Sequence, residues 1–477
     1  MRKWMDVAAP DDPNAWFDLS DMWGTGRGSY ETSDAFGSAT ATTAAGEQAI
    51  QAAWAFKGLS SDRAYLIGTK IWQITPSTMA ATDRTGGITI GTGLMMCQYG
   101  DITILARGTS NSLASSSGGN FSALAGSPSA KFVCTAANAV LAFNTSVSAD
   151  GWAASDVGDY TNWSTGEAAS GRILENNGPI TAVVPLGNDV YVFKSDSIFR
   201  MTYVGGTVKW QIQKVVHGVG CFDPNSGAWG GSPAVATNRG IVFHGNANFS
   251  GSYSWWLYDG ASPPVLLNPA TTVTAGVPTY DPIFDRLVIW YPYQVSTFVF
   301  RTKVYTYSFS DGLWGKCSEI AETVDIHAPV PVRGDQSVSF AGSTTGSLRT
   351  VFEGDGSGGS IYYRVPVAPT SSASCYLQTT KIGASDHKTT FSRLIPQLRK
   401  RTDLGTDSAS LELTLFRERE DTTAQTTRTI SESSGRKRFD LHGGANTDNF
   451  ARFKVTWAGL DVDVDDFQVV AKPAGTD

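Results

Sequence analysis

The stretch that decides the fold is ITAVVPLGNDVYVFKSDSIFRMTYV, which runs from Ile180 to Val204. Apolar and polar residues alternate in three short runs, and polar turns at Gly187–Asp189 and Lys194–Ser197 separate these runs. Alternation over about four to eight residues is typical of a half-buried β-strand, and turns this short join neighbouring antiparallel strands. The stretch therefore predicts a three-stranded β-meander.

Similar units, each a short strand, a polar turn and a short aromatic strand, recur on both sides of this meander. They lie at Ala64–Ile74, Asp101–Ala106, Lys131–Phe143, Gly240–Tyr258, Asp285–Tyr307, Ser337–Gly342 and Gly359–Arg364. Their spacing is about 40–55 residues, which is the range of β-propeller blades. The pattern predicts an all-β chain with a β-propeller-like domain of short meander blades over residues 61–369.

The charge density changes after Val365–Pro369. Residues 370–477 hold 15 basic and 15 acidic residues, or 30 of 108, whereas residues 1–369 hold 22 and 29, or 51 of 369. A step of this size, next to two prolines, indicates a domain boundary. Alternating runs beyond it predict a C-terminal β-sandwich-like domain over residues 370–477. These runs are Thr390–Leu398, Ser410–Phe416, Arg436–Leu441, Phe450–Trp457 and Phe467–Val470.

Residues 1–60 are interpreted as an irregular N-terminal arm, with a short helix predicted within the Ala-rich segment Ala44–Lys57. The arm carries four large aromatic residues, Trp4, Trp16, Phe17 and Trp23. Each such side chain is worth about 1.5–3 kcal/mol when it is buried, so we expect a partner to cover them. These four residues are the first candidates for an interface.

Composition excludes several classes of protein. The chain has 37 Lys+Arg against 44 Asp+Glu, a net charge of −7, which argues against a broad basic face for nucleic acid. The sequence has no run of 18 apolar residues and no apolar secretory segment near Met1, so we expect no membrane span and folding in the cytosol. The five widely spaced cysteines are expected to be buried and reduced.

No spacing of His, Cys, Asp or Glu predicts a metal centre, and no nucleophile elbow or phosphate loop is present. We therefore expect no catalytic residue, no metal and no other cofactor. The acidic run Asp461–Asp466 is interpreted as a solvated edge strand rather than a calcium site.

Two basic clusters lie in the C-terminal domain and complete the interface candidates. They are Arg399, Lys400 and Arg401, and Arg436, Lys437 and Arg438. They are either solvated loop charges or electrostatic contacts to an acidic neighbour, such as the acidic propeller of the same chain.

The residues from Asp156 to Gly260 also carry a resemblance. It begins at Asp156–Trp163 (DVGDYTNW) and continues through Gly178–Lys194, Ser197–Gly205 and His217–Cys221. Val242–Gly245 and Trp255–Gly260 follow in the same order. This order resembles the β-propeller tail hub, or tail nozzle, proteins of short-tailed bacteriophages, over about residues 155–315.

The resemblance implies a structural protein and no enzyme. It implies a homo-hexamer in the virion tail, assembled in the host cytoplasm and joined to the portal or an adaptor, with tail fibres or spikes nearby and a channel for DNA passage. Two alternatives remain: another phage baseplate or fibre-anchor protein, and a glycan-binding or glycan-cleaving propeller. The last alternative requires acidic residues beside stacked aromatic side chains in the central tunnel.

Overall fold

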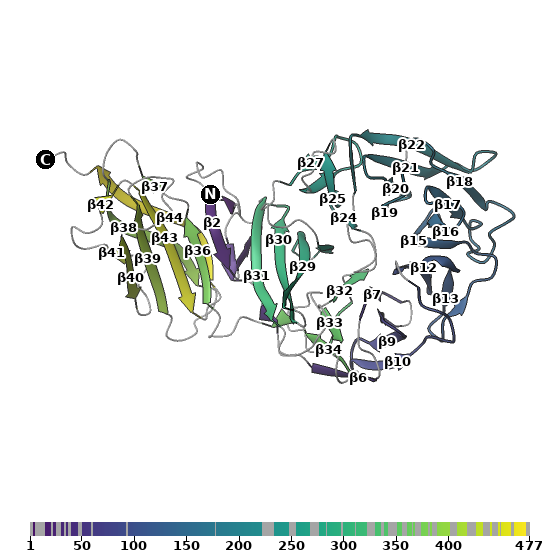
Figure 1. Cartoon of the computed structure of the whole chain (residues 1–477), viewed down its shortest axis with the longest axis horizontal. Coiled ribbons are helices and arrows are strands. Elements are labelled where there is room, and N and C mark those ends of the chain that lie inside the picture. Colours follow the sequence, from purple (N-terminus) through teal and green to yellow (C-terminus); the bar gives the residue numbers. More distant parts are fainter. Residues whose placement is uncertain are drawn as a thin grey trace.

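The computed structural model describes residues 50–341, except 59–60, 92–93, 177, 222–232, 248–253, 268–275, 283, 297–298, 311, 322–329 and 335–337. Outside that range it describes the strands named below. The described residues are all-β, as predicted, and none of their segments is a helix long and apolar enough to cross a membrane. A ring of sheets forms most of the molecule, and further strands lie at one side of the ring (Figure 1).

The ring is a β-propeller whose described residues form seven blades, each a small antiparallel sheet. The first four blades are β7 (Ala52–Phe56), β8 (Arg63–Ile67), β9 (Ile71–Thr75) and β10 (Ala80–Asp83); β11 (Leu94–Tyr99), β12 (Ile102–Ser112), β13 (Ala114–Ser116) and β14 (Ser122–Ala123); β15 (Ser129–Ala136), β16 (Ala139–Thr145), β17 (Gly151–Ala154) and β18 (Ala169–Arg172); and β19 (Ala182–Leu186), β20 (Asp189–Phe193), β21 (Ser197–Tyr203) and β22 (Trp210–His217).

The last three blades are β24 (Ala234–Thr237), β25 (Gly240–Ala247), β26 (Ser254–Tyr258) and β27 (Val265–Leu266), with β23 (Val219–Cys221) beside β25; β28 (Val277–Asp281), β29 (Arg286–Ser296), β30 (Val299–Ser308) and β31 (Leu313–Ala321); and β32 (Val330–Gly334), β33 (Val351–Gly354), β34 (Ser360–Arg364) and β6 (Thr40–Ala45). The predicted meander at 180–204 is confirmed as β19, β20 and β21 of the fourth blade.

The innermost strands close the ring. β7, β11, β15, β19, β24, β28 and β32 contact one another in that order, and β32 pairs in parallel with β7. The seventh blade takes its outer strand from the other end of the domain, because β6 pairs with β34. Strands far apart in the sequence therefore complete the last blade, so that the ring is held shut by backbone hydrogen bonds.

Apolar side chains between neighbouring blades make the core. Phe193 of the fourth blade and Phe243 of the fifth are both fully buried, with ring centroids 5.1 Å apart. Tyr65 of the first blade meets Phe121 of the second at 5.4 Å in an edge-on contact. Because each sheet buries both faces in this way, blade strands can be apolar runs with few charges. The half-buried alternation expected within Ile180–Val204 therefore does not hold for β20, whose last four residues are all apolar and buried.

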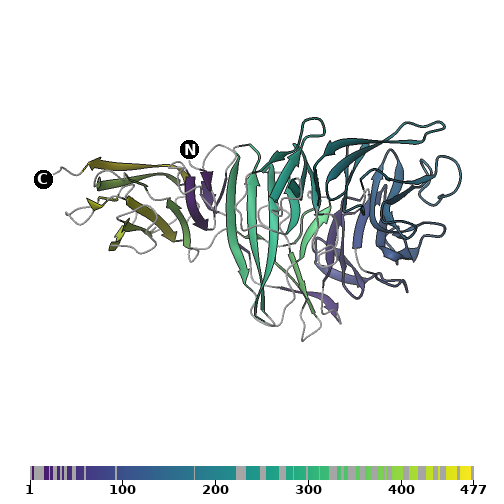
Figure 2. The same cartoon turned by 45° about the horizontal axis from the view of Figure 1, so that its top comes forward.

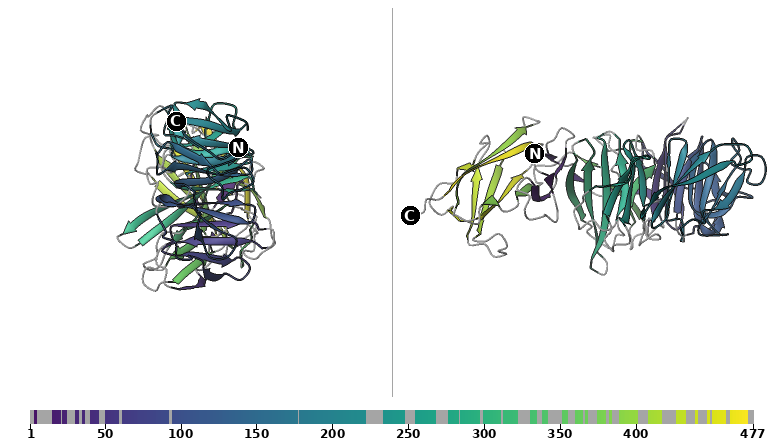
Figure 3. Two further views of the ribbon diagram at one scale, coloured as in Figure 1. Left: turned by 90° about the vertical axis from the view of Figure 1, so that its right-hand side faces the viewer. Right: turned by 90° about the horizontal axis from the view of Figure 1, so that it is seen from above.

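A second unit lies beside the sixth blade, at the left of Figure 1 and along the long axis in Figure 3. One of its sheets has the order β1 (Lys3–Trp4), β2 (Ala15–Ser20), β36 (Ser374–Thr379), β43 (Phe450–Ala458), β39 (Ser408–Phe416) and β40 (Thr426–Glu432), with β37 (Ile382–Gly383) beside β43. The other contains β44 (Val462–Pro473), β38 (Thr389–Lys400) and β41 (Phe439–Asp440), with β42 (Thr447–Asp448) beside β38.

The N-terminal arm joins the two units. β3 (Met22–Gly24) pairs with β31 of the sixth blade, and β4 (Tyr30–Thr32) pairs with both β3 and β44. One sheet therefore runs from β28 in the propeller to β38 in the sandwich, as the tilted view in Figure 2 helps to follow. β5 (Ala35–Phe36) pairs with β35 (Pro366–Val367) near the junction.

Two expectations about the first 60 residues need correction. The arm is more regular than predicted, because β1 to β6 all lie in it and all join sheets. The helix predicted within 44–57 is wrong, since β6 ends at Ala45 and β7 occupies Ala52–Phe56. Alanine is a strong helix former, but Ala52, Ala53 and Ala55 are almost fully buried in an inner strand, where neighbouring blades converge and leave room for small side chains.

This topology sets the limits of a propeller that folds alone. We expect a chain of residues 37–369 to fold cooperatively, because it keeps β6 and every other blade strand while it omits β1 to β5 and the sandwich. Limited proteolysis of the whole chain should cut between 360 and 380. A single denaturant transition with native-like far-ultraviolet circular dichroism would support the boundary, and a protected 360–380 segment would contradict it.

Candidate functional site

A cavity of about 460 Å³ lies at the centre of the propeller. Inner strands of six blades line it, namely β7, β11, β19, β24, β28 and β32. The buried part of the wall includes Trp54, Met96 and Val184, whereas Asn238, Pro282 and Gly334 are exposed. These three exposed residues lie at or just after the carboxyl ends of their strands, so the cavity meets solvent there.

The walls of the cavity are fixed by hydrogen bonds between side chains. Trp290 Nε1 donates to Thr279 Oγ1 at 2.9 Å, and Tyr280 Oη donates to Asp285 Oδ1 at 2.7 Å. Arg239 Nε and Nη2, from the fifth blade, donate to Asp285 Oδ2 at 3.2 and 3.1 Å. Burial, helped by the Asp285 carboxylate, raises the pKa of the Tyr280 hydroxyl. This network ties the fifth and sixth blades together beside the cavity.

The chemistry of the lining bears on the glycan-cleaving alternative. A glycosidase acts through a pair of carboxyl groups at the scissile bond. The described lining residues include the aromatic side chains of Trp54, Phe56 and Tyr280 but no Asp or Glu, and Arg333 is the charged residue among them. The described cavity thus offers stacking surfaces and one cationic side chain, and lacks the carboxylate pair that this alternative requires.

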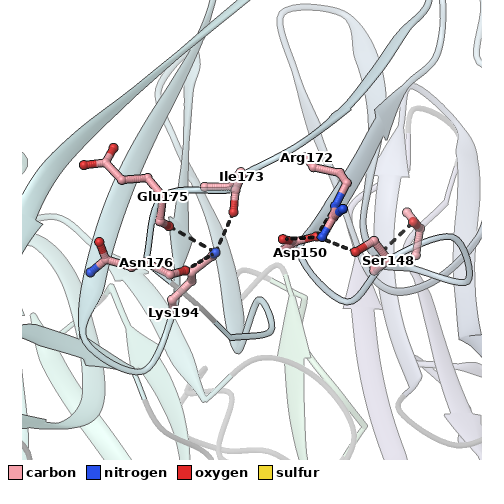
Figure 4. Close-up of polar contacts among 8 residues, drawn as sticks. Ser148, Asp150, Arg172, Ile173, Glu175, Asn176 and Lys194 are labelled. Carbon is pink, nitrogen blue, oxygen red and sulfur yellow. Dashed lines mark hydrogen bonds and ion pairs between the residues drawn. The ribbon is translucent and has the colours of Figure 1, made fainter.

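A second constellation joins the third and fourth blades and is drawn in Figure 4. The side chain of Lys194, at the end of β20, is fully buried. Its Nζ donates to the carbonyl oxygens of Ile173, Glu175 and Asn176 at 2.5, 3.2 and 2.6 Å. Burial of the ammonium group lowers the pKa of Lys194. The lysine therefore holds the connection from β18 to β19, and its role is to join two blades.

Asp150 and Arg172 form an ion pair on the same side of the third blade (Figure 4). Arg172 Nε donates to Asp150 Oδ1 at 2.8 Å and Nη2 donates to Oδ2 at 3.1 Å, while Ser148 Oγ also donates to Asp150. The Arg172 hydrogen bonds, with the smaller contribution of Ser148, lower the pKa of Asp150 to about 2.

We expect Asp150→Asn to reduce the free energy of unfolding by about 1 kcal/mol near neutral pH, since the Arg172 side chain is half exposed and solvent screens the pair. The pKa of Asp150 is lower in the folded than in the unfolded chain, so the stabilisation is present above its ordinary value near 3.8 and is lost as the pH falls towards 2. Urea unfolding of both proteins at several pH values checks this. A difference that does not shrink below about pH 4 would contradict it.

The first stretch of the family resemblance, Asp156–Trp163, is a loop between β17 and β18. Asp156 Oδ1 accepts hydrogen bonds from the backbone N–H of Val157 and Glu167 at 2.9 and 2.7 Å. Asn162 Nδ2 donates to Asp156 Oδ2 at 3.2 Å and to Thr165 Oγ1 at 2.8 Å. These polar residues organise the backbone of their own loop, so the motif is structural.

The remaining predicted residues are placed as follows. Cys97, Cys134 and Cys221 are buried thiols that form no disulfide bond, which confirms the expectation for these three cysteines. No group of three metal-binding side chains occurs among the residues that the structure describes. Asp463 of the acidic run lies opposite Arg399 of β38 and Glu31 of β4 in the strand register. The run is therefore paired on both sides at Asp463, and the prediction of an edge strand is wrong.

The interface candidates do not form a single cluster in the described structure. Trp4 lies in β1 and Trp16 and Phe17 lie in β2, both in a sheet of the sandwich, whereas Trp23 lies in β3, which pairs with β31 of the sixth blade. Arg399 and Lys400 end β38, in the sandwich. Arg401, Arg436, Lys437 and Arg438 lie outside the described residues. Sequence reasoning passed over Lys194 and Arg333, because a lysine in a polar turn and an arginine before a glycine carry no signal of burial.

No protein-family model matches the chain, and no curated protein matches it. Among solved structures, that of YCF48 bound to D1 peptide has 11% identity and a TM-score of 0.37, and the match covers 69% of this chain and 94% of that one. Apo AztD from Citrobacter koseri has 10% identity and a TM-score of 0.34, with 69% and 83% covered. Scores this low say nothing of function, so the propeller assignment here rests on the strand order of the chain itself.

Proposed function

We propose that the chain is a structural subunit of the tail of a short-tailed bacteriophage, in the position of a hub or nozzle. The observation that carries the proposal is the shared sheet from β28 to β38, in which the N-terminal arm joins propeller and sandwich edge to edge. Backbone pairing of this kind resists relative movement of two units better than a flexible linker does. A tail part that must withstand docking and genome ejection needs that coupling.

The sequence resemblance over about residues 155–315 supports the same function, and its segments occupy blade positions. Ser197–Gly205 covers β21, His217–Cys221 covers β23, and Val242–Gly245 lies in β25. These residues build and connect blades, in keeping with a structural role that involves no bond chemistry.

In this proposal the DNA passes between subunits and not through a propeller. The central cavity of about 460 Å³ has the volume of a small-molecule pocket, which is roughly 300–1,000 Å³, and a DNA duplex does not fit in it. A homo-hexamer would place a wider channel on its own axis. The six chains together would carry a formal charge of 6 × −7 = −42. An acidic channel repels the phosphates and lets DNA slide, since each neutralised phosphate adds affinity. The portal or an adaptor and the fibres or spikes would be the neighbours of this ring.

The test is to purify the phage particles whose genome encodes this chain and to reconstruct their tails by electron cryomicroscopy. The expected result is a ring of six copies below the portal or adaptor, with DNA or an open channel on the ring axis. A particle that lacks the protein, or a map with a single copy per tail, would overturn the proposal. A map that places it in a baseplate or at a fibre base would favour the alternative phage role.

A further inference from the structure

We propose that the central cavity of the propeller is a binding site for a small organic anion that carries an apolar ring or short chain. This inference is independent of the role in a phage tail, because it concerns a cavity within one chain. Its volume of about 460 Å³ is within the range of sites for small molecules.

The wall of the cavity determines the apolar part of the ligand. Trp54, Phe56, Met95 and Met96 enter the lining from two neighbouring blades. Pro278 and Pro282 contribute from the sixth blade, and proline rings present a rigid apolar surface. Aromatic and thioether side chains offer polarizable surfaces on which a ring or chain can pack. A wholly polar ligand would lose its water here without compensation.

Arg333 determines the charge of the ligand. It is half-buried in β32, opposite Trp54 in the parallel pair with β7, and it is the one charged residue among the described residues that line the cavity. A guanidinium is a planar donor with several N–H groups, and it can hold a carboxylate or sulfonate in addition to contacts within the fold. Among the lining residues that the structure describes there is no Asp or Glu, so no described carboxylate of the lining repels an anion.

The cavity is ready to bind and has an entrance. The Trp290–Thr279 and Tyr280–Asp285 hydrogen bonds fix two of its wall residues before any ligand arrives. A preformed wall reduces the ordering cost of binding. Asn238 and Gly334 are exposed at the strand ends, so a ligand can enter there with its apolar end first.

The experiment uses the whole chain and two fluorescent probes of similar shape, the anion 8-anilinonaphthalene-1-sulfonate and the neutral N-phenyl-1-naphthylamine. We expect the anion to bind saturably at one site per chain. With methyl-labelled methionine, the signals of Met95 and Met96 should shift during the titration, while that of Met201, buried in the fourth blade, should not. This measurement needs no substitution and therefore no variant that must fold.

Three variants sharpen the test. Val235→Trp, which fills the cavity, should weaken the binding of both probes by about tenfold or more. Arg333→Gln should weaken the binding of the anionic probe by about tenfold and that of the neutral probe by much less. Val147→Ser, at a position 89% exposed on the third blade, should leave the affinity for both probes unchanged. Binding that does not saturate, or that leaves Met95 and Met96 unmoved, would overturn the site. If Arg333→Gln weakened the binding of both probes equally, the proposal that the site prefers anions would be overturned.

Discussion

A chain that lacks residues 1–45 is expected to lose the propeller fold, because the deletion removes β6 and leaves the seventh blade without its outer strand. β6 pairs with β34 and contacts β10 of the first blade, so it closes the ring on both sides. Ile361 and Phe352, both fully buried in the seventh blade, lie in the sheet that β6 completes. We expect the free energy of unfolding to fall by at least about 4 kcal/mol, because backbone hydrogen bonds and apolar burial are both lost. That is a large share of the roughly 5–15 kcal/mol typical of a domain.

The matched control is a chain that lacks residues 1–36. It loses β1 to β5 but retains β6, so the ring stays closed while the shared sheet between β31 and β44 is interrupted. Thermal unfolding should show a propeller transition close to that of the whole chain, with the sandwich transition separated from it. Equal damage from both deletions would contradict a specific role of β6. Addition of a peptide of residues 37–46 to the longer deletion should restore part of the lost stability.

The sequence predicted the blades better than it predicted their closure. The short apolar runs of Ile180–Val204 and the turns between them are local, and a local pattern suffices for antiparallel neighbours such as β19, β20 and β21. The pairing of β6 with β34 joins residues about 320 positions apart, by the register of Tyr363 with Thr40. No local signal specifies such a partner, so the arm appeared irregular when its strands were considered without the sheets they join.

The role of a candidate residue likewise depends on the residues that the folded chain brings beside it. The acidic and polar residues of Asp156–Trp163 looked like a signature, and they are used within their own loop. Arg333 precedes a glycine in what reads as a turn, and only the closed ring brings it beside Trp54 from the other end of the domain. The central cavity is assembled from six blades, so sequence alone could suggest a tunnel but not its lining.

Lys194→Met is expected to have the second large effect, because it should lower the free energy of unfolding by about 3 kcal/mol. The substitution keeps most of the side-chain volume but removes the ammonium group that three carbonyl oxygens surround. Each buried carbonyl that loses its donor costs about 1–3 kcal/mol of stability. The substitution also removes a desolvated charge, which offsets part of the total cost of the three carbonyl groups. Urea unfolding followed by tryptophan fluorescence measures the change, and hydrogen exchange should rise in the connection from Ile173 to Ile180.

Lys209→Met provides the matched control, because Lys209 also donates to backbone carbonyl groups of the third blade, those of Gly166 and Ala168. Its side chain is half-buried in the fourth blade, where water can replace the lost donor, so we expect the free energy of unfolding to change by no more than about 1 kcal/mol. Lys194→Gln should fall between the two, since an amide can donate to some of the three carbonyl groups. If Lys194→Met and Lys209→Met cost the same, the buried ammonium would not be what joins the third and fourth blades. The junction would then depend on its apolar contacts and on other hydrogen bonds, such as those of Lys209.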